Sequence, residues 1–480
     1  MDSPKTPTAH ETPAQEAWAD EHQSHDTGDQ APWAPSFANG RQDLVWLPPS
    51  QGAEEGNLHG FPAATTARPG GAEPSGIQDV PLVPSIPPRS RFAAPRHLST
   101  RPGDVQVPVS PGDVELVHQT LAGVIPIADE VTSHFYALLF LRYPRLRGLF
   151  PAAMGGQRDR LFGAMLASAK NIDDPIVLLP FLQALGRGHR KHGVGAEHYP
   201  AFGECLISAV ARYAMKTWSA SAARAWQRSY ATISRVMIDA AEDDERRTPP
   251  WWYGEIVAHE LRTPDTAVIT LRPDQSYPFL AGQYTVVETP WWPRVWRHYS
   301  MASAPRRDGM LKLHVKALPT GWVSNALVHR ARPGDVLRLG SSAGSMTVDH
   351  TTDRGLLCIA GGTGIAPVKA LLEDVIQHGV QRSVEFYYAA SLGRDLYELP
   401  LLLHLEQVHP WFSVQTLIRE QSLVTLPDLI ERHGPWNACD VYVSGPPGMI
   451  RATVRALIHL GMPRAHIWYD PVDQLIAAGT

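Results

Sequence analysis

The sequence is poor in cysteine, and its three cysteines lie far apart. Cys205, Cys358 and Cys439 form no CxxC pair. This spacing excludes a zinc site or a disulfide framework built on cysteine, and it suits a reducing compartment. An isolated cysteine is most often a small buried hydrophobic residue, so we assign these three no role.

An excess of basic charge is also absent. The chain has 43 Lys and Arg against 48 Asp and Glu, a net charge of -5, whereas a nucleic-acid-binding protein needs a basic surface. No run reaches the roughly 20 apolar residues that a membrane helix needs. The first residues, MDSPKTPTAH, lack the basic and apolar regions of a secretory signal. We therefore expect a cytoplasmic protein with no nucleic-acid or membrane partner.

Proline is distributed unevenly along the chain. Of the 43 prolines, 18 fall within residues 1–111, among Gly, Ser, Gln and short acidic runs without apolar periodicity. Such a segment cannot bury enough apolar surface to offset the entropy of ordering it. The composition predicts a disordered tail over residues 1–110, with a partner-docking arm as the alternative.

The remaining residues predict three domains of different classes. In 111–246, apolar residues recur at intervals of three and four, which predicts an all-α domain. Residues 251–350 contain short alternating runs separated by turns, as in an antiparallel β-barrel. The runs are Gly254–His259, Ala267–Leu271, Gln283–Glu288, Lys312–Ala317 and Val336–Leu339. In 354–480, apolar strands alternate with helices, which predicts a parallel α/β sheet.

One histidine in the helical domain is a candidate metal ligand. Phe181, Leu185 and His189 follow one another at intervals of four, so one helix face carries two apolar side chains and an imidazole. A haem pocket needs such a ligand, apolar walls and a polar group on the opposite side. Taken alone, the spacing also fits a structural histidine.

The surrounding sequence resembles the globin domain of flavohaemoglobins over roughly residues 113–243. The matched segments are HFYALLFLRYPRLRGLFP at 134–151, QRDRLFGAML from Gln157, His189, and Tyr199 ten residues later. The resemblance implies that His189 is the proximal iron ligand and that Tyr199 supports it. It also implies that the hydroxyl of Tyr136 hydrogen-bonds dioxygen on the distal side.

By the same resemblance, Gln157 and Leu161 line the distal side, and Phe150 packs against the porphyrin. The chain departs from the family at two positions. Gly188 stands where the family has a lysine, and Ala241 stands where it has a glutamate that pairs with the proximal side. Glu242 is one residue further, a rotation of about 100° around the helix. A proximal carboxylate raises the basicity of the ligand, so its loss bears on oxygen activation more than on haem binding.

The segment RHYSMAS, Arg297–Ser303, resembles the RxYSxxS flavin fingerprint of ferredoxin-reductase-type domains. In that role Arg297 binds the pyrophosphate and Tyr299 faces the flavin ring. Ser300 donates a hydrogen bond to the flavin nitrogen that accepts hydride, and Ser303 completes the motif. The alternative is a strand followed by an ordinary arginine-bearing loop.

A second flavin segment follows at 320–327, TGWVSNAL. It places Gly321 and Ser324 at a predicted helix start, where backbone amides suit the flavin diphosphate. Together the two segments imply FAD as a cofactor.

Residues 356–372, LLCIAGGTGIAPVKALL, predict a strand, a glycine loop and a helix. Gly362, Thr363, Gly364 and Pro367 fit the GxGxxP form of the reductase family, in which the loop and the helix start bind NAD(P)H. A later loop, SGPPGM at Ser444–Met449, resembles the one beside the nicotinamide.

Two further features concern the nucleotide. Arg394 is a candidate contact for the adenosine ribose or a 2′-phosphate, without deciding between NADH and NADPH. At the C-terminus, relatives often end in a Tyr-Glu-x-Phe-like segment whose aromatic shields the flavin. Here Tyr469 and Asp470 match its start, but Val472 cannot stack on a flavin.

The resemblance implies an enzyme that passes electrons from NAD(P)H through FAD to haem b and oxidises nitric oxide with dioxygen to nitrate. Two alternatives stay open. One is a flavin-dependent NAD(P)H reductase with another acceptor, and the other is a haem-based gas sensor.

Overall fold

The computed structural model describes residues 110–379 and 381–470. The predicted disordered tail, apart from Ser110, and Val472 of the C-terminal segment lie outside the described residues.

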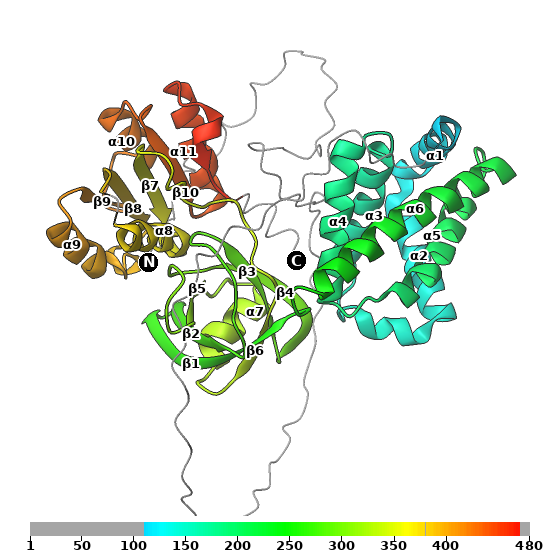
Figure 1. Cartoon of the computed structure of the whole chain (residues 1–480), viewed down its shortest axis with the longest axis horizontal. Coiled ribbons are helices and arrows are strands. Elements are labelled where there is room, and N and C mark those ends of the chain that lie inside the picture. Colours follow the sequence, from blue (N-terminus) through cyan, green and yellow to red (C-terminus); the bar gives the residue numbers. More distant parts are fainter. Residues whose placement is uncertain (1–109, 380, 471–480) are drawn as a thin grey trace, which may run out of the picture. The chain divides into compact units, whose positions relative to one another are not determined.

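The first described region is a bundle of helices (Figure 1). They are α1 (Pro111–Val124), α2 (Ala128–Arg142), α3 (Gly155–Lys170), α4 (Pro175–Arg190), α5 (Tyr199–Tyr213) and α6 (Ala220–Glu245). Three of them begin at a residue whose side chain accepts hydrogen bonds from the first free backbone amides: Ser110, Asp174 and Ser219. The predicted all-α architecture is confirmed.

One helical stretch, Pro111–Arg142, is long and apolar enough to cross a membrane by length and composition alone. The sequence-based expectation that no run qualifies was therefore too strict. The stretch is not one straight helix, since Pro126 lies in the short 3-10 turn Ile125–Ile127 between α1 and α2. The two helices pack against α6 and α5 respectively, as core helices of a bundle do.

Helices α4 and α6 approach each other closely at Gly186. This glycine is buried, and a Cβ atom added to it would overlap the backbone of Met237 on α6. Leu178, Phe181 and Leu182 of α4 form a buried cluster with Met237. Only a residue without a side chain allows this approach, and Gly186 lies one helical turn before His189.

The second region is a six-stranded antiparallel sheet. Its strands are β1 (Trp252–Thr263), β2 (Thr266–Pro273), β3 (Tyr284–Thr289), β4 (Trp292–Ser300), β5 (Leu311–Lys316) and β6 (Val336–Leu339). They are ordered β4-β3-β6-β1-β2-β5. The sheet curls so that its two edges meet in a bridge between Met301 and Leu313, around a buried apolar core. The barrel was predicted, but β4 was not among the predicted strands.

The third region is a five-stranded parallel sheet with helices between its strands. The strands are β7 (Gly355–Gly361), β8 (Val384–Ala390), β9 (Phe412–Ile418), β10 (Cys439–Ser444) and β11 (Ile467–Trp468), in the order β11-β10-β7-β8-β9. The helices are α8 (Ile365–His378), α9 (Leu399–Val408), α10 (Leu426–His433) and α11 (Pro447–His459). The predicted parallel α/β sheet is confirmed.

Both faces of this sheet are buried, which explains the nearly continuous apolar strands. Cys358 and Phe386 belong to the core on the α8 side, whereas Leu357, Ile359 and Tyr387 belong to the core on the side of α10 and α11. The strand order reverses at β7: β8 and β9 are added on one side of it, and β10 and β11 on the other. Ligands of open α/β sheets bind at such a switch point, at the carboxyl ends of the strands.

The close approach at Gly186 can be tested by adding one methyl group. We expect Gly186→Ala to destabilise the helical region by about 1–3 kcal/mol, because α4 must move away from α6. The matched control is Gly188→Ala on the same helix, where nothing lies within 4 Å of the added Cβ. It is expected to be neutral or stabilising by up to about 1 kcal/mol. Thermal unfolding followed by far-UV circular dichroism measures both, and equal midpoints for the two variants would contradict the packing argument.

Candidate functional site

The end of α4 is fixed in place by α6. The guanidinium of Arg190 forms an ion pair with Asp244 and donates to the carbonyl of Thr248 at 2.7 Å. Because the ion pair is mostly buried, it holds the last turn of α4 and therefore the direction of His189.

His189 is hydrogen-bonded to the tyrosine that the sequence predicts as its support. Its Nδ1 lies 3.2 Å from the Tyr199 hydroxyl, and the hydroxyl of Tyr230 donates to the Tyr199 carbonyl at 2.7 Å. Among the described residues, the second ring nitrogen, Nε2, has no hydrogen-bond partner. An imidazole that binds iron through Nε2 carries its proton on Nδ1, and this N–H then donates to the Tyr199 oxygen.

Burial sets the protonation of this pair. It lowers the pKa of His189 to about 4, with the Lys191 ammonium adding to the effect, and it raises the pKa of Tyr199 to about 12. At neutral pH the imidazole is therefore uncharged and the phenol is protonated. A neutral imidazole is the form that binds a metal ion.

Tyr136 lies buried on α2 within an aromatic cluster. Its ring is in edge contact with Phe150 at 5.4 Å between centroids, and Phe140 and Phe202 complete the cluster. Its hydroxyl donates to the backbone carbonyl of Gln157 at 3.3 Å. Tyr136, Phe150 and Gln157 thus lie together, with Gln157 making the contact through its backbone, and their roles at a haem stay predictions. Phe202, on α5, was not predicted.

The side chain of Gln157 faces a residue that the sequence analysis missed. Arg160 donates to Oε1 of Gln157 at 2.9 Å, and burial lowers the pKa of its guanidinium. Its charge also helps to lower the pKa of Lys191, to about 8, although burial is the larger cause. These two half-buried cations suit an anionic group of a cofactor. The spacing i, i+3 from Gln157 was the signal available in the sequence. Leu161 is half-buried on the same helix.

The departure from the family at Ala241 has a structural counterpart. A cavity of about 280 Å³ lies beside Tyr199, and Ala241, Glu242 and Val194 are among the residues that line it. Glu242 is exposed and forms no hydrogen bond or ion pair within the described part of the chain. No described carboxylate is hydrogen-bonded to the His189–Tyr199 pair.

The predicted flavin residues lie on β4 and directly after it. Arg297, Tyr299 and Ser300 are half-buried on the strand, where Arg297 pairs with Val287 in the register. Burial lowers the pKa of the Arg297 guanidinium and raises the pKa of the Tyr299 phenol. Within the described residues, the one hydrogen bond of the Arg297 side chain goes to the Trp296 carbonyl at 3.0 Å. Most of its donors are therefore available to a diphosphate.

The buried hydroxyl of Ser303 is a second feature that suits a bound polar group. It is 1% exposed, and its hydroxyl has no hydrogen-bond partner among the described residues. An unsatisfied buried hydroxyl costs about 1–3 kcal/mol, so a bound polar molecule that completes it is favoured. This observation fits the assignment of Ser303 to the flavin motif.

Gly321 begins a short helical turn, α7 (Trp322–Asn325), as its N-cap. The Ser324 hydroxyl accepts from the amide of Leu318 at 3.2 Å and donates to the carbonyl of Gly321 at 3.0 Å. Ser324 therefore holds the loop in shape. The predicted helix start is present, although α7 has only four residues.

The glycine loop leaves the central strand β7 at the switch point of the parallel sheet. Gly362, Thr363 and Gly364 form a single 3-10 turn, and α8 begins at the next residue with Pro367 buried in its first turn. A Cβ atom on Gly364 would overlap the carbonyl of Ser444. The loop thus packs directly against the SGPPGM segment, and the two predicted nucleotide motifs meet.

The two remaining candidate residues for the nucleotide site lie in the region of the parallel sheet, without a contact among the described residues that points to a role. Arg394 is exposed in the short turn Gly393–Asp395 that follows β8. Tyr469 is half-buried and packs against the core on the α10 and α11 side. The roles of all these residues stay predictions.

Comparison with known proteins covers the three regions separately. Residues 133–237 match the Globin family model, residues 254–348 match the model described as "Oxidoreductase FAD-binding domain", and residues 358–455 match the "Oxidoreductase NAD-binding domain" model.

Curated relatives match over more than half of the chain. The flavohemoprotein of Halalkalibacterium halodurans is 30% identical over 302 residues, covering 57% of this chain and 73% of the relative. The flavohemoprotein of Chromobacterium violaceum is 27% identical over 396 residues, covering 74% of this chain and 97% of the relative. A solved flavohemoglobin of Malassezia yamatoensis with bound FAD and heme has a TM-score of 0.61 at 18% identity. It covers 75% of this chain and 99% of that one, and supports the fold.

The contact between the glycine loop and Ser444 generates a prediction. Gly364→Ala is expected to raise KM for NAD(P)H by about tenfold or more, because the added methyl group must push the two loops apart. A displacement of 1 Å in a binding site costs on the order of 10²-fold in rate. The control is Gly112→Ala, exposed in the first turn of α1 with nothing within 4 Å of the new Cβ. Steady-state oxidation at increasing NADH measures KM for both variants, and an unchanged KM in Gly364→Ala would refute the assignment.

Proposed function

The chain belongs to the flavohemoprotein family, and from this premise we propose that it is an NAD(P)H-dependent nitric oxide dioxygenase. The globin, FAD-binding and NAD-binding regions make it a globin–reductase electron-transfer enzyme that acts on small molecules. In this proposal its substrates are NAD(P)H, dioxygen and nitric oxide, and its product is nitrate.

The observation that carries the proposal is the state of His189. The imidazole is neutral, its Nδ1 is hydrogen-bonded to Tyr199, and its Nε2 has no partner among the described residues. This is the donor that a haem iron requires, held in one orientation.

The donors on β4 suit FAD, and the glycine loop suits the nicotinamide nucleotide. When bound, the flavin supplies a hydride acceptor that releases single electrons, and the haem supplies a redox-active iron for gas chemistry. The protein itself contributes the groups that bind and orient these cofactors. Arg297 offers donors to the diphosphate, Ser303 offers a hydroxyl, and Gly364 keeps the nucleotide loops together.

Tyr136 supplies a proton donor on the distal side. Burial raises the pKa of its phenol, so the hydroxyl stays protonated at physiological pH. Its bond of 3.3 Å to the Gln157 carbonyl is long, since O–H···O bonds are usually near 2.7–2.8 Å. The hydroxyl can therefore exchange this weak partner for a stronger acceptor while the aromatic cluster excludes water.

A second function is favoured by the proximal side. Ala241 stands where the resemblance leads us to expect a carboxylate, and no described carboxylate is hydrogen-bonded to the His189–Tyr199 pair, beside which a cavity lies. A less basic histidine donates less electron density to a metal. NAD(P)H-dependent reduction of another acceptor, such as a ferric chelate or a quinone, is the alternative.

A cytoplasmic location is part of the proposal. All three cysteines are free thiols in the structure, and two of them are buried. Free thiols fit a reducing compartment.

Tyr136→Phe tests the distal role. We expect NAD(P)H- and oxygen-dependent consumption of nitric oxide to fall by about tenfold or more, because a buried hydrogen-bond donor is lost. Haem content and the rate of flavin reduction are expected to stay unchanged. The control is Tyr143→Phe, which removes a hydroxyl from the end of the same helix, where it donates to Glu204 at 2.5 Å. A nitric oxide electrode measures both variants, and equal rates would remove Tyr136 from the mechanism.

His189→Ala separates the two candidate functions. We expect the Soret absorption band and nitric oxide consumption to disappear, while flavin absorption and NADH-driven reduction of a soluble dye remain. If the purified wild-type protein consumes no nitric oxide above free flavin, yet reduces ferric chelates or quinones equally well in both forms, the reductase alternative replaces the dioxygenase.

A further inference from the structure

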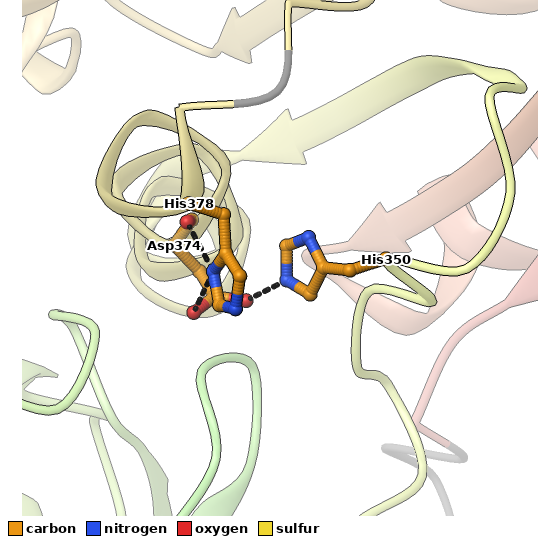
Figure 2. A group of neighbouring side chains, drawn as sticks. All are labelled: His350, Asp374 and His378. Atoms are coloured by element: carbon orange, nitrogen blue, oxygen red, sulfur yellow. Dashed lines mark hydrogen bonds and ion pairs between the residues drawn. The ribbon is translucent and has the colours of Figure 1, made fainter. Parts of the chain in front are cut away.

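Three side chains capable of binding a metal ion converge at the C-terminal end of α8 (Figure 2). Asp374 and His378 lie one turn apart on this helix, and His350 comes from the segment between β6 and β7. Nε2 of His350 lies 2.7 Å from a carboxylate oxygen of Asp374. The two imidazole rings are stacked at 3.6 Å between centroids with 15° between their planes. One ligand atom from each residue lies within 4.8 Å of the others.

The cluster is separate from the nucleotide motifs. The glycine loop precedes the first residue of α8, whereas His378 is its last, and 14 helical residues span about 20 Å. None of the three side chains takes part in the function proposed above.

The segment that carries His350 is held in place by a buried arginine. The guanidinium of Arg382 donates to the carbonyls of Asp349, Thr352 and Arg354 at 3.3–3.4 Å. Side chains oriented by such surrounding bonds lose less entropy when they bind a ligand. The position of His350 beside α8 is thus fixed by the fold.

The donor set is typical of a particular class of metal ion. Two imidazole nitrogens and one carboxylate oxygen suit zinc and similar divalent transition metals, whereas calcium and magnesium prefer oxygen ligands alone. Zinc binds these atoms at about 2.0–2.2 Å, which places tetrahedral donors about 3.4 Å apart. To bind the ion, the His378 ring must turn out of the stack, and its side chain is 49% exposed and has room to do so. Its Nδ1 lies 3.0 Å from the backbone carbonyl of Asp374, which leaves Nε2 as its ligand atom.

We propose that His350, Asp374 and His378 form a binding site for a divalent transition-metal ion of the zinc class. The ion joins the end of α8 to the segment that precedes β7, and solvent completes its coordination. Nε2 of His350 is free for the metal only when the ring proton sits on Nδ1, which lies 3.5 Å from Nη2 of Arg382. This nearby positive charge makes the site weaker than a structural zinc site with four protein ligands.

Zinc binding to the full-length protein, loaded with its cofactors, tests the site by isothermal titration calorimetry. The chain has 21 histidines, and others among them can bind zinc weakly. The zinc binding of the wild type is therefore compared with that of variants. We expect the wild-type protein to bind one Zn²⁺ above the background. His378→Gln and His350→Asn are expected to weaken this binding by at least about tenfold. The matched control is His404→Gln, an exposed histidine on α9, which is expected to bind like the wild type.

A second readout reports the ligands directly. Co²⁺ bound by two histidines and a carboxylate absorbs visible light, and this absorption is expected in the wild type and in His404→Gln but not in His378→Gln. The proposal is wrong if His378→Gln retains the stoichiometry, the affinity and the cobalt spectrum of the wild type. If His350→Asn changes the flavin or haem content, the test of the metal site rests on His378→Gln alone, because His378 is half-exposed.

Discussion

The hydrogen bond between His189 and Tyr199 is the contact on which the chemistry proposed for this chain depends. It joins two helices, α4 and α5, and fixes which edge of a neutral imidazole is left for a metal. Burial produces the neutrality, since it lowers the pKa of His189 to about 4. Two features of α4 keep the ring in place: the close approach to α6 at Gly186 and the ion pair of Arg190. Without them, the same residues would form a helix with an ordinary histidine.

The proximal side has a cavity beside Tyr199 that Ala241 helps to line. The resemblance leads us to expect a glutamate at this position, and no described carboxylate is hydrogen-bonded to the His189–Tyr199 pair. Glu242 also lines this cavity, but it is exposed and forms no hydrogen bond or ion pair within the described part of the chain. Among the described residues, Tyr199 is the sole hydrogen-bond partner of the His189 imidazole. The consequence concerns the electron density at the metal, whereas the ligand itself stays in place.

The reductase regions depend on a different constraint, the close approach of backbone segments. Gly364 touches Ser444, a residue that follows it by 80 positions, because β7 and β10 are neighbours in the sheet. The same neighbourhood creates the switch point at which a nucleotide can bind. On the flavin side, Arg297 lies on the edge strand β4, and the buried hydroxyl of Ser303 follows it. In both regions the order of the strands in the sheet determines which short sequence motifs lie next to each other.

The sequence by itself determined the three architectures and the short motifs. Apolar periodicity, the GxGxxP loop and the RxYSxxS segment are local patterns whose physics depends on neighbouring residues. Only the tertiary structure decided that Gln157 offers its carbonyl to Tyr136, that Arg160 joins this side, and that β4 is a strand. It alone brought His350 to the end of α8. These contacts join residues distant in sequence through helix packing and strand order, and no local pattern encodes the distance between them.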